Sequence, residues 1–422
     1  MASLQRLFRA FEHRLDCTFD GRGREFWVIG VLTFLQGYAW FLVAPFFPLY
    51  ARRLGADDML VGLYTMFPPL LSVLVSIPGG AIASSIGSRG VFQYSLTVGF
   101  LAAGAYALSP GHWLLCLPQI LFGIANALFW PTQTSYMTEV IPERNRGKML
   151  GLMMSITAIG AALGPASAGL VAGYLGYRTV FVVYAVALAL SLLACGLLPA
   201  CNDRVNPGML RDAVAGSVGS GLAVLSNPAL VLTTLVSFTT FMFWAVIETF
   251  FPLHLEDRAY AVAAIGGIIT VRTTSMTMAR IGLGTILGTV RVIPLMFVSL
   301  LASAVFMMFV PLARTPPLLV GATAIMGAGS GILPVLTTMQ IAMATTPEER
   351  PIAMAVDSTA CSLGRIAASF MLGVVAKFMG SAASLVVGGA LVGALTVGTA
   401  LWWNYESRGG ERREGRSHAP VG

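Results

Sequence analysis

The sequence predicts an all-α integral membrane protein with about twelve transmembrane helices, arranged as two pseudo-symmetric six-helix bundles. Of the 422 residues, 56% are hydrophobic and only 11% are charged, whereas a soluble domain carries roughly 25% charged residues to keep its surface in water. An α-helix needs about 20 apolar residues to cross a hydrocarbon core of about 30 Å. Uncharged runs of that length fill the chain, so lipid is the predicted solvent for most of its surface.

The apolar runs fall into two groups of six. The first group comprises residues 27–50, 59–83, 91–108, 113–137, 150–174 and 180–199. The second group comprises residues 229–252, 261–283, 292–311, 318–343, 352–378 and 382–403. We therefore expect an N-terminal bundle over 27–199 and a C-terminal bundle over 229–403, joined by a cytoplasmic linker over 200–228. A cytoplasmic amphipathic segment over 1–26 precedes them, and a basic cytoplasmic tail over 404–422, expected to be disordered, follows.

The positions of the charges predict the orientation of the chain. Most of the 26 lysines and arginines fall in segments that are cytoplasmic if the N-terminus is cytoplasmic, and few fall in the short outer loops. The positive-inside rule therefore places both termini in the cytoplasm. These loops explain the net charge of +7 without nucleic-acid binding. Because the first run has full membrane length, it is predicted to be a retained span. The expected location is the cell membrane, inner or plasma, as a multi-pass protein.

Matched spacings indicate an internal repeat. Arg146 precedes Gly160 by the same interval by which Arg350 precedes Gly364. Each of these pairs begins in a Pro-Glu-containing loop, after the fourth span in the first case and after the tenth in the second. Two related halves are typical of secondary transporters, which bind their substrate near the bilayer midplane.

The loop after the second span carries a family resemblance. Gly80, Gly87 and Arg89 lie in a segment that resembles the G-x-x-x-D-[RK]-x-G-[RK] motif of the major facilitator transporters. Ser84 stands where the motif has Asp. In the fourth span, Gln119 likewise stands where many proton-coupled exporters of this family carry Arg. Proton-linked drug export therefore cannot simply be transferred from the resemblance.

The fifth span supports the same resemblance. Residues 160–169 resemble the family motif G-x-x-x-G-P-x-x-G-G through Gly160, Gly164 and Pro165. Small residues four apart let helix backbones approach closely, and a proline bends a helix, which suits a moving interface. The resemblance covers nearly the whole chain in topology. It implies the major facilitator fold and alternating access, in which two bundles rock about a central substrate site.

Charged residues inside the predicted spans occur only in the second half of the chain. They are Glu248, Arg272, Arg280, Asp357, Arg365 and Lys377. A charge near the bilayer centre costs at least about 2.5 to 3.5 kcal/mol, so such residues usually face water or a partner. Arg272 and Arg365 fall near mid-depth and are candidate anchors for an anionic or zwitterionic substrate. The alternative is that each pairs with an acidic residue or with helix carbonyls and supports packing.

The two acidic residues are candidate proton-coupling groups. Glu248 lies on a helical stripe with Ser237, Phe241 and Trp244, and either proton transfer or pairing with an arginine would explain its place in a span. Asp357 and Arg280 both lie near the inner ends of their spans. A salt bridge between them could close a cytoplasmic gate, or it could be a permanent packing pair.

Neutral side chains supply further candidate substrate contacts, with hydrogen bonding between helices as the alternative. These residues are Asn126, Trp130 and Gln133 on the fourth span, Gln36 and Tyr38 on the first, and Trp244 on the seventh.

The predicted function is secondary active transport of a small solute by alternating access, with an organic anion or zwitterion as the first substrate class. A proton-linked exporter of drugs or amphipathic compounds, including lysolipids, and a non-transporting membrane sensor or scaffold are the alternatives.

No phosphate-binding loop for ATP and no cluster of catalytic residues occurs in the sequence, so it is not expected to be an enzyme. The five cysteines have no metal-ligand spacing, and no metal or cofactor is expected. The expected partners are the lipid bilayer, a small-molecule substrate and protons, and the protein is expected to be a monomer.

Overall fold

The computed structural model describes residues 23–140, 146–198, 226–286, 290–346 and 349–417. Most of the predicted amphipathic segment, most of the linker and the end of the tail lie outside these ranges. Within them, the structure is helical and contains no strand.

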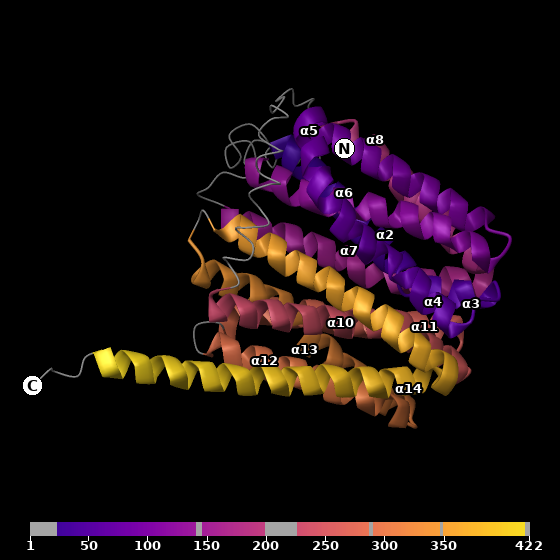
Figure 1. Ribbon diagram of the computed structural model, residues 1–422. Helices are drawn as coiled ribbons and strands as arrows, with labels where there is room; N and C mark the ends of the chain where they lie inside the picture. Colours follow the sequence, from indigo (N-terminus) through magenta and orange to yellow (C-terminus); the bar gives the residue numbers. More distant parts are fainter. Residues whose placement is uncertain (1–22, 141–145, 199–225, 287–289, 347–348, 418–422) are drawn as a thin grey trace, which may run out of the picture. The chain divides into compact units, whose positions relative to one another are not determined.

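The helices of the first half of the chain follow one another with short connections. They are α2 (Gly23–Val43), α3 (Phe47–Arg53), α4 (Asp58–Thr65), α5 (Phe67–Leu108), η1 (His112–Leu115), α6 (Cys116–Val140), α7 (Arg146–Leu175) and α8 (Tyr177–Cys195). Those of the second half are α10 (Pro228–Asp257), α11 (Val262–Ile286), α12 (Val292–Phe309), η3 (Val310–Leu312), α13 (Pro316–Ala344) and α14 (Arg350–Ser417) (Figure 1).

The predicted fold class is confirmed. Eleven stretches of the described chain are helical, long and apolar enough to cross a membrane. The last of these, Ile352–Glu406, has 55 residues and is interrupted at Gly380, where φ is 83°. Since a crossing needs about 20 residues, each side of this break is long enough to span. This break lies between the predicted spans 352–378 and 382–403.

Three details differ from the sequence prediction. The predicted first span is divided into α2 and α3, with a turn that contains Pro45, and the predicted second span is divided at Met66, just before Pro68 and Pro69. Proline lacks an N–H group and so interrupts the helical hydrogen-bond ladder. At the other end, α14 continues to Ser417, so the first part of the tail is helical and not disordered. Its Glu and Arg residues are good helix formers.

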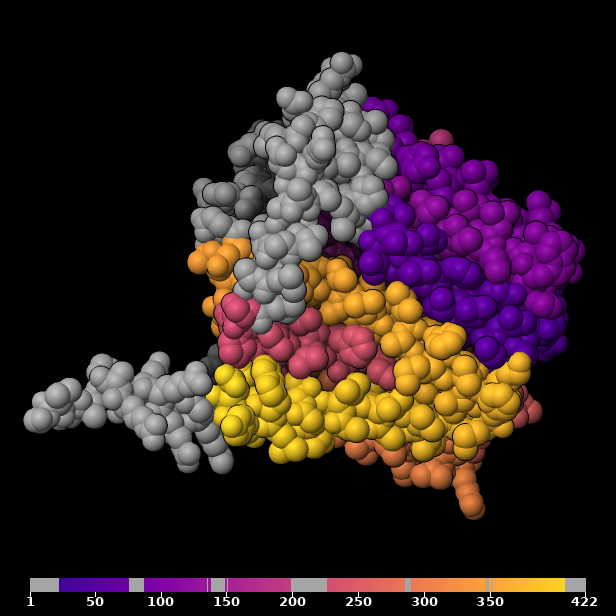
Figure 2. Space-filling view, viewed as in Figure 1, coloured from indigo at the N-terminus to yellow at the C-terminus, as the bar shows by residue number. Residues whose placement is uncertain are grey.

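The chain forms two compact units. The first unit comprises Met1–Ala56, Phe67–Arg211 and Ala259–Thr270, and the second comprises Asp57–Met66, Asp212–Arg258 and Val271–Gly422. Each unit therefore includes a short piece from the other half of the sequence: α4 belongs to the second unit, and the start of α11 belongs to the first. In the second unit, Figure 2 shows the two parts of α14, orange and yellow, on either side of α10.

The exchanged pieces pack through glycine. In the second unit, a methyl group at Gly62 of α4 would overlap the carbonyl oxygen of Ser369 in α14. In the first unit, a methyl carbon at Gly266 of α11 would lie 2.5 Å from the carbonyl oxygen of Pro165 in α7. Only residues without a side chain permit helix backbones to approach this closely.

The internal repeat appears in the packing. Gly160 of α7 approaches α2 so closely that a methyl group there would overlap the carbonyl oxygen of Phe34. Gly364 of α14 approaches α10 in the same way, against the carbonyl oxygen of Phe238. Phe238 lies as far beyond Phe34 in the sequence as Gly364 lies beyond Gly160. Corresponding positions of the two halves therefore make corresponding contacts.

The first family motif forms the turn inside α5. Gly80 lies in the helical part, and Gly87 breaks the helix with a φ of 75°, a conformation that favours glycine. Arg89 follows the break, and its Nη2 donates to the carbonyl oxygen of Gly196 at 3.1 Å. The motif thus ties this turn to the end of α8.

An exposed ion pair lies beside the contact between α4 and α14. Lys377 Nζ is 3.4 Å from Asp57 Oδ2, and the two side chains are 42% and 46% exposed. Asp57 also caps α4, because its Oδ1 accepts a hydrogen bond from Leu60 N at 2.8 Å.

Two variants separate the cap from the ion pair. Lys377→Gln and Asp57→Asn both remove the pair but keep the cap, and each is expected to change the free energy of unfolding by less than about 1 kcal/mol. Asp57→Ala removes both, and the lost cap should cost about 1 kcal/mol more. Thermal unfolding of the purified variants measures the difference. Equal losses in Asp57→Ala and Asp57→Asn would show that the cap contributes nothing.

Candidate functional site

A largely buried ion pair joins α10 and α14 in the second unit. Arg365 Nη1 donates to Glu248 Oε2 at 2.8 Å, and the two side chains are 17% and 10% exposed. The two helices lie side by side in Figure 1. Gly364 of α14 makes the close approach, against the carbonyl oxygen of Phe238 in α10. Of the two explanations for Glu248 that the sequence leaves open, the structure shows pairing with an arginine. A pair of this kind is costly to break, because removal of one partner leaves the other charge buried and uncompensated.

Two aromatic rings flank the arginine. The guanidinium carbon of Arg365 lies 5.2 Å from the ring centroid of Phe241 and 5.9 Å from that of Trp244. Both distances suit cation–π attraction. The indole Nε1 of Trp244 is buried and has no hydrogen-bond partner among the described residues. The predicted stripe on α10 therefore faces α14, with its aromatic residues beside the ion pair.

Arg272 adds a second buried positive charge. It lies on α11, is 2% exposed, and its Nε has no hydrogen-bond partner among the described residues. Its charge is attracted by Glu248 and repelled by Arg365. The backbone around Arg272 is fixed by α13, because a methyl group at Gly327 would overlap the carbonyl oxygen of Arg272. Nearly all buried polar groups in proteins are hydrogen-bonded, so this unpartnered guanidinium nitrogen marks Arg272 as a candidate contact for a polar ligand.

Asp357 lies on the same face of α14 as Arg365, two turns earlier. Cys361, between them, has its Sγ 3.9 Å from Asp357 Oδ2, and Ser237 of α10 is a neighbour of both. Asp357 Oδ1 is buried without a hydrogen-bond partner in the described part of the chain. Cys361 is not among the residues predicted from the sequence, although its spacing of four residues from Asp357 and from Arg365 would have identified it.

Arg280 and Asp357 are not brought together as the gating hypothesis requires. Arg280 Nε donates to the carbonyl oxygen of Gly331 in α13 at 2.7 Å, and its guanidinium carbon lies 6.0 Å from the ring centroid of Trp244. No ion pair joins Arg280 to Asp357 within the described residues. In this conformation Arg280 belongs with the aromatic residues of α10. We call Glu248, Arg272, Arg280, Asp357 and Arg365 the charged cluster.

The neutral candidates of the first half hold helices together within the first unit. Gln36 Nε2 donates to Asn126 Oδ1 at 3.1 Å, and Gln133 Nε2 donates to Thr33 Oγ1 at 2.9 Å, so both bonds link α2 to α6. Gln36 Oε1 remains buried without a partner among the described residues. These bonds are the structural alternative that the sequence leaves open for the polar side chains.

Three more of the predicted residues also make contacts inside the first unit. The hydroxyl of Tyr38 accepts a hydrogen bond from Ser167 Oγ of α7 at 2.9 Å. Trp130 packs edge-on against its neighbour Phe129, with ring centroids 5.6 Å apart. A methyl carbon at Gly164, in the second motif, would lie 2.9 Å from the Leu42 nitrogen of α2.

A partly buried contact of the first unit involves Glu25, which stands just before the predicted first span. The hydroxyl of Tyr136 donates to Glu25 Oε2 at 2.9 Å. Glu25 is not among the residues predicted from the sequence, because it stands outside the apolar run.

The ion pair of the second half has no counterpart at the corresponding positions of the first half. The interval that relates Gly160 to Gly364 relates Trp40 to Trp244, so this tryptophan occurs in both halves. The same interval relates Ala44 to Glu248 and Ala161 to Arg365. The positions of the ion pair are thus occupied by alanine in the first half. No group of three His, Cys, Asp or Glu side chains that could hold a metal occurs in the described ranges.

Comparisons with known proteins identify related sequences. The family model described as Major Facilitator Superfamily matches residues 29–364. The multidrug resistance protein MdtG of Salmonella paratyphi C and that of Salmonella typhi are each 27% identical to this chain over 319 residues. Each alignment covers 73% of this chain and 78% of the relative.

Solved structures share the fold. The crystal structure of the nucleoside transporter NupG matches with a TM-score of 0.73 at 16% sequence identity, covering 90% of this chain and 98% of that one. A POT family transporter in complex with a thioalcohol-conjugated peptide matches with a TM-score of 0.70 at 12% identity, covering 90% and 96%. At these identities the likeness establishes the fold alone.

Proposed function

Because this chain belongs to the Major Facilitator Superfamily of membrane transporters, we propose that it carries an organic anion across the membrane together with a proton. The observation that carries the proposal is the composition of the charged cluster. It contains three arginines and two carboxylates, and Arg272 is buried without an ion-pair partner of its own among the described residues. A carboxylate or phosphate group on the substrate would supply the missing negative charge.

The ion pair gives a physical link between proton and substrate. While Glu248 is ionised, it holds Arg365 at 2.8 Å. Protonation of Glu248 removes the charge that holds Arg365. It leaves Arg272 and Arg365 as two buried cations, and a bound anion would stabilise both. Binding of the anion and binding of the proton therefore favour each other. Release of the proton restores the ion pair and expels the anion. Two bundles over 27–199 and 229–403 would provide the alternating access.

The aromatic residues indicate the rest of the substrate. Phe241 and Trp244 lie beside Arg365, and Trp244 Nε1 has no hydrogen-bond acceptor in the described structure. An apolar or aromatic body next to the anionic group would contact these rings, and an acceptor atom on it would satisfy the indole. We therefore favour aromatic carboxylates over inorganic anions.

A second candidate function is export of amphipathic cations or neutral drugs. It is favoured by the relatives named multidrug resistance proteins at 27% identity. In that case the ionised Glu248 would bind the cation in place of Arg365, and proton and substrate would compete for the same carboxylate.

Ligand-induced thermal stabilisation distinguishes the two functions. The purified protein is heated with benzoate, citrate, glucose 6-phosphate or tetraphenylphosphonium, each at an acidic and an alkaline pH. Because proton and anion binding favour each other in this proposal, benzoate should raise the unfolding temperature more strongly at the acidic pH. A ligand at about 100 times its Kd stabilises by about 2.7 kcal/mol. Arg272→Gln should abolish this effect.

The control is Arg314→Gln, which removes an exposed arginine outside the charged cluster. This variant should keep the response to benzoate. Stabilisation by tetraphenylphosphonium alone, stronger at the alkaline pH, would contradict the anion proposal and support drug export. Stabilisation by benzoate that survives in Arg272→Gln would refute the role of Arg272.

A further inference from the structure

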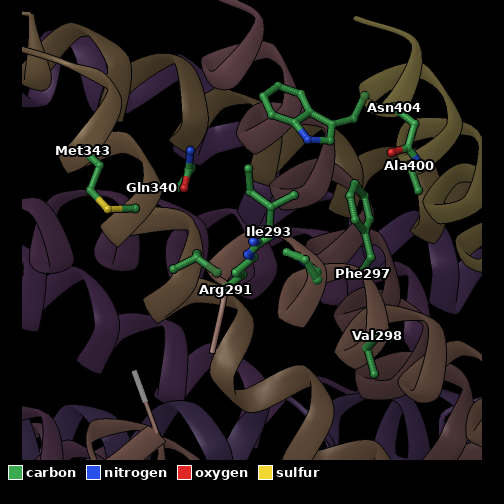
Figure 3. Close-up of a pocket in the computed structure, with 11 residues that line it drawn as sticks. Arg291, Ile293, Phe297, Val298, Gln340, Met343, Ala400 and Asn404 are labelled. Atoms are coloured by element: carbon green, nitrogen blue, oxygen red, sulfur yellow. The ribbon is translucent and has the colours of Figure 1, made fainter. Parts of the chain in front are cut away.

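A pocket separate from the charged cluster lies at one end of the second unit. It has a volume of about 700 Å³ and is formed by the start of α12, the end of α13 and the end of the apolar part of α14. Figure 3 shows Gln340 and Met343 on one side of Arg291 and Ile293, with Phe297, Ala400 and Asn404 on the other. The pocket shares no lining residue with the charged cluster. Its volume is within the range of small-molecule sites.

Two polar side chains of this pocket, Gln340 and Arg291, have no side-chain partner among the described residues. Gln340 is 8% exposed, and its amide makes no hydrogen bond to another described residue. Arg291 is the one charged residue among the described lining residues, and no described acidic residue pairs with it. It is also the N-cap of α12, an 18-residue helix whose first N–H groups are not capped by a side chain. A helix N-terminus and a guanidinium both attract anions.

The surroundings of the pocket indicate a membrane ligand. Met343 on one side and Phe297 on the other give the pocket apolar walls, and Val298 of its lining and the nearby Leu401 are exposed apolar side chains. In a membrane protein such side chains face lipid. Trp403 lines the pocket at the end of the apolar run, the depth at which tryptophan marks the boundary between lipid and water. The sequence predicts that this end of the helices is cytoplasmic.

We propose that this pocket binds an anionic phospholipid of the adjacent leaflet. The phosphate contacts Arg291 and the N-terminus of α12, the amide of Gln340 hydrogen-bonds to the headgroup or glycerol oxygens, and an acyl chain lies between Phe297 and Met343. Basic pockets between helices at the cytoplasmic side are suited to such headgroups. The proposal is independent of which solute the protein transports.

Lipid titration of the delipidated, detergent-purified full chain tests the proposal. Phosphatidylglycerol is expected to raise the unfolding temperature, and phosphatidylcholine is not. Arg291→Gln should shift the half-maximal phosphatidylglycerol concentration upward by about fivefold, the factor for one interfacial arginine. Gln340→Leu, which keeps the volume, should also shift it upward. Native mass spectrometry should find fewer retained phosphatidylglycerol molecules in both variants.

One matched control variant decides the outcome. Arg314→Gln removes an exposed arginine from the connection at the other ends of α12 and α13 and should leave the titration unchanged. The proposal is overturned if Arg291→Gln and Arg314→Gln give the same titration. It is also overturned if phosphatidylcholine stabilises as well as phosphatidylglycerol, or if inorganic phosphate alone reproduces the stabilisation.

Discussion

Glu248→Gln is expected to destabilise the protein more than Arg365→Gln does, although each variant neutralises one partner of the same ion pair. Glu248→Gln leaves Arg272 and Arg365 as two buried cations that repel each other. Arg365→Gln leaves Glu248 with the attraction of Arg272. Breaking a buried pair by removing one partner costs about 3 to 5 kcal/mol, and the partial exposure of these side chains argues for the lower value, about 3 kcal/mol, for Glu248→Gln.

The double variant Glu248→Gln/Arg365→Gln provides the test of coupling. It leaves Arg272 as the single uncompensated charge of this trio, so its stability should lie between those of the two single variants. Because the residues are in direct contact, the interaction energy from the cycle should be about 0.5 to 3 kcal/mol. Thermal unfolding in one detergent measures all four proteins. An Arg365→Gln protein that is less stable than Glu248→Gln would show that Arg272 does not compensate Glu248.

The same variants relate stability to function. If an anion replaces the Glu248 carboxylate during transport, benzoate should stabilise Glu248→Gln more than it stabilises the wild type. A lack of any response to benzoate in Glu248→Gln would separate the ion pair from substrate binding and leave it a purely structural role.

Gly364→Ala should strongly reduce the amount of folded protein. The added methyl group would overlap the carbonyl oxygen of Phe238, which belongs to the backbone of α10 and cannot rotate away. Overpacking typically costs about 1 to 3 kcal/mol, and a backbone obstacle argues for the upper end, about 3 kcal/mol. Since the next residue is Arg365, moving α14 away from α10 should also break the ion pair. Transport should therefore be lost even in the protein that folds.

The matched control is Gly398→Ala in the same α14, where an added methyl group meets no atom within 4 Å. It should leave expression and unfolding temperature unchanged. Gly160→Ala, at the corresponding position of the first half, should resemble Gly364→Ala in stability. Fluorescence-detected gel filtration measures the folded fraction. Equal profiles for Gly364→Ala and Gly398→Ala would disprove the importance of the close approach.

The fold could be predicted because hydropathy and helix length act locally along the chain. An apolar run of membrane length must be helical, since lipid offers no hydrogen-bond partners to the backbone. The interruptions at Pro45 and Met66 were missed because an apolar run continues through them. Average hydropathy does not register the loss of an N–H donor.

The site was predicted only in part, for a different reason. Charges in apolar runs identified Glu248, Arg272 and Arg365, because buried charge is costly wherever it occurs. Partners were harder to predict. Arg280 contacts Trp244 and Gly331 and does not pair with Asp357, because depth in the membrane does not fix how far each helix is rotated about its axis. That rotation depends on contacts such as the one between Gly331 and Met276, which lie far apart in sequence.

Because the two compact units exchange short pieces of the chain, the two halves should associate even when they are expressed as separate polypeptides. If the two halves were expressed as separate polypeptides cut in the linker, the N-terminal polypeptide would carry α4 away from α14, and the C-terminal polypeptide would carry the start of α11 away from α7. In each polypeptide alone, the glycine of the exchanged piece, Gly62 or Gly266, would lack the helix against which it packs. Co-expressed, each would offer the surface that the other lacks, so the two polypeptides should purify together through a tag on only one of them.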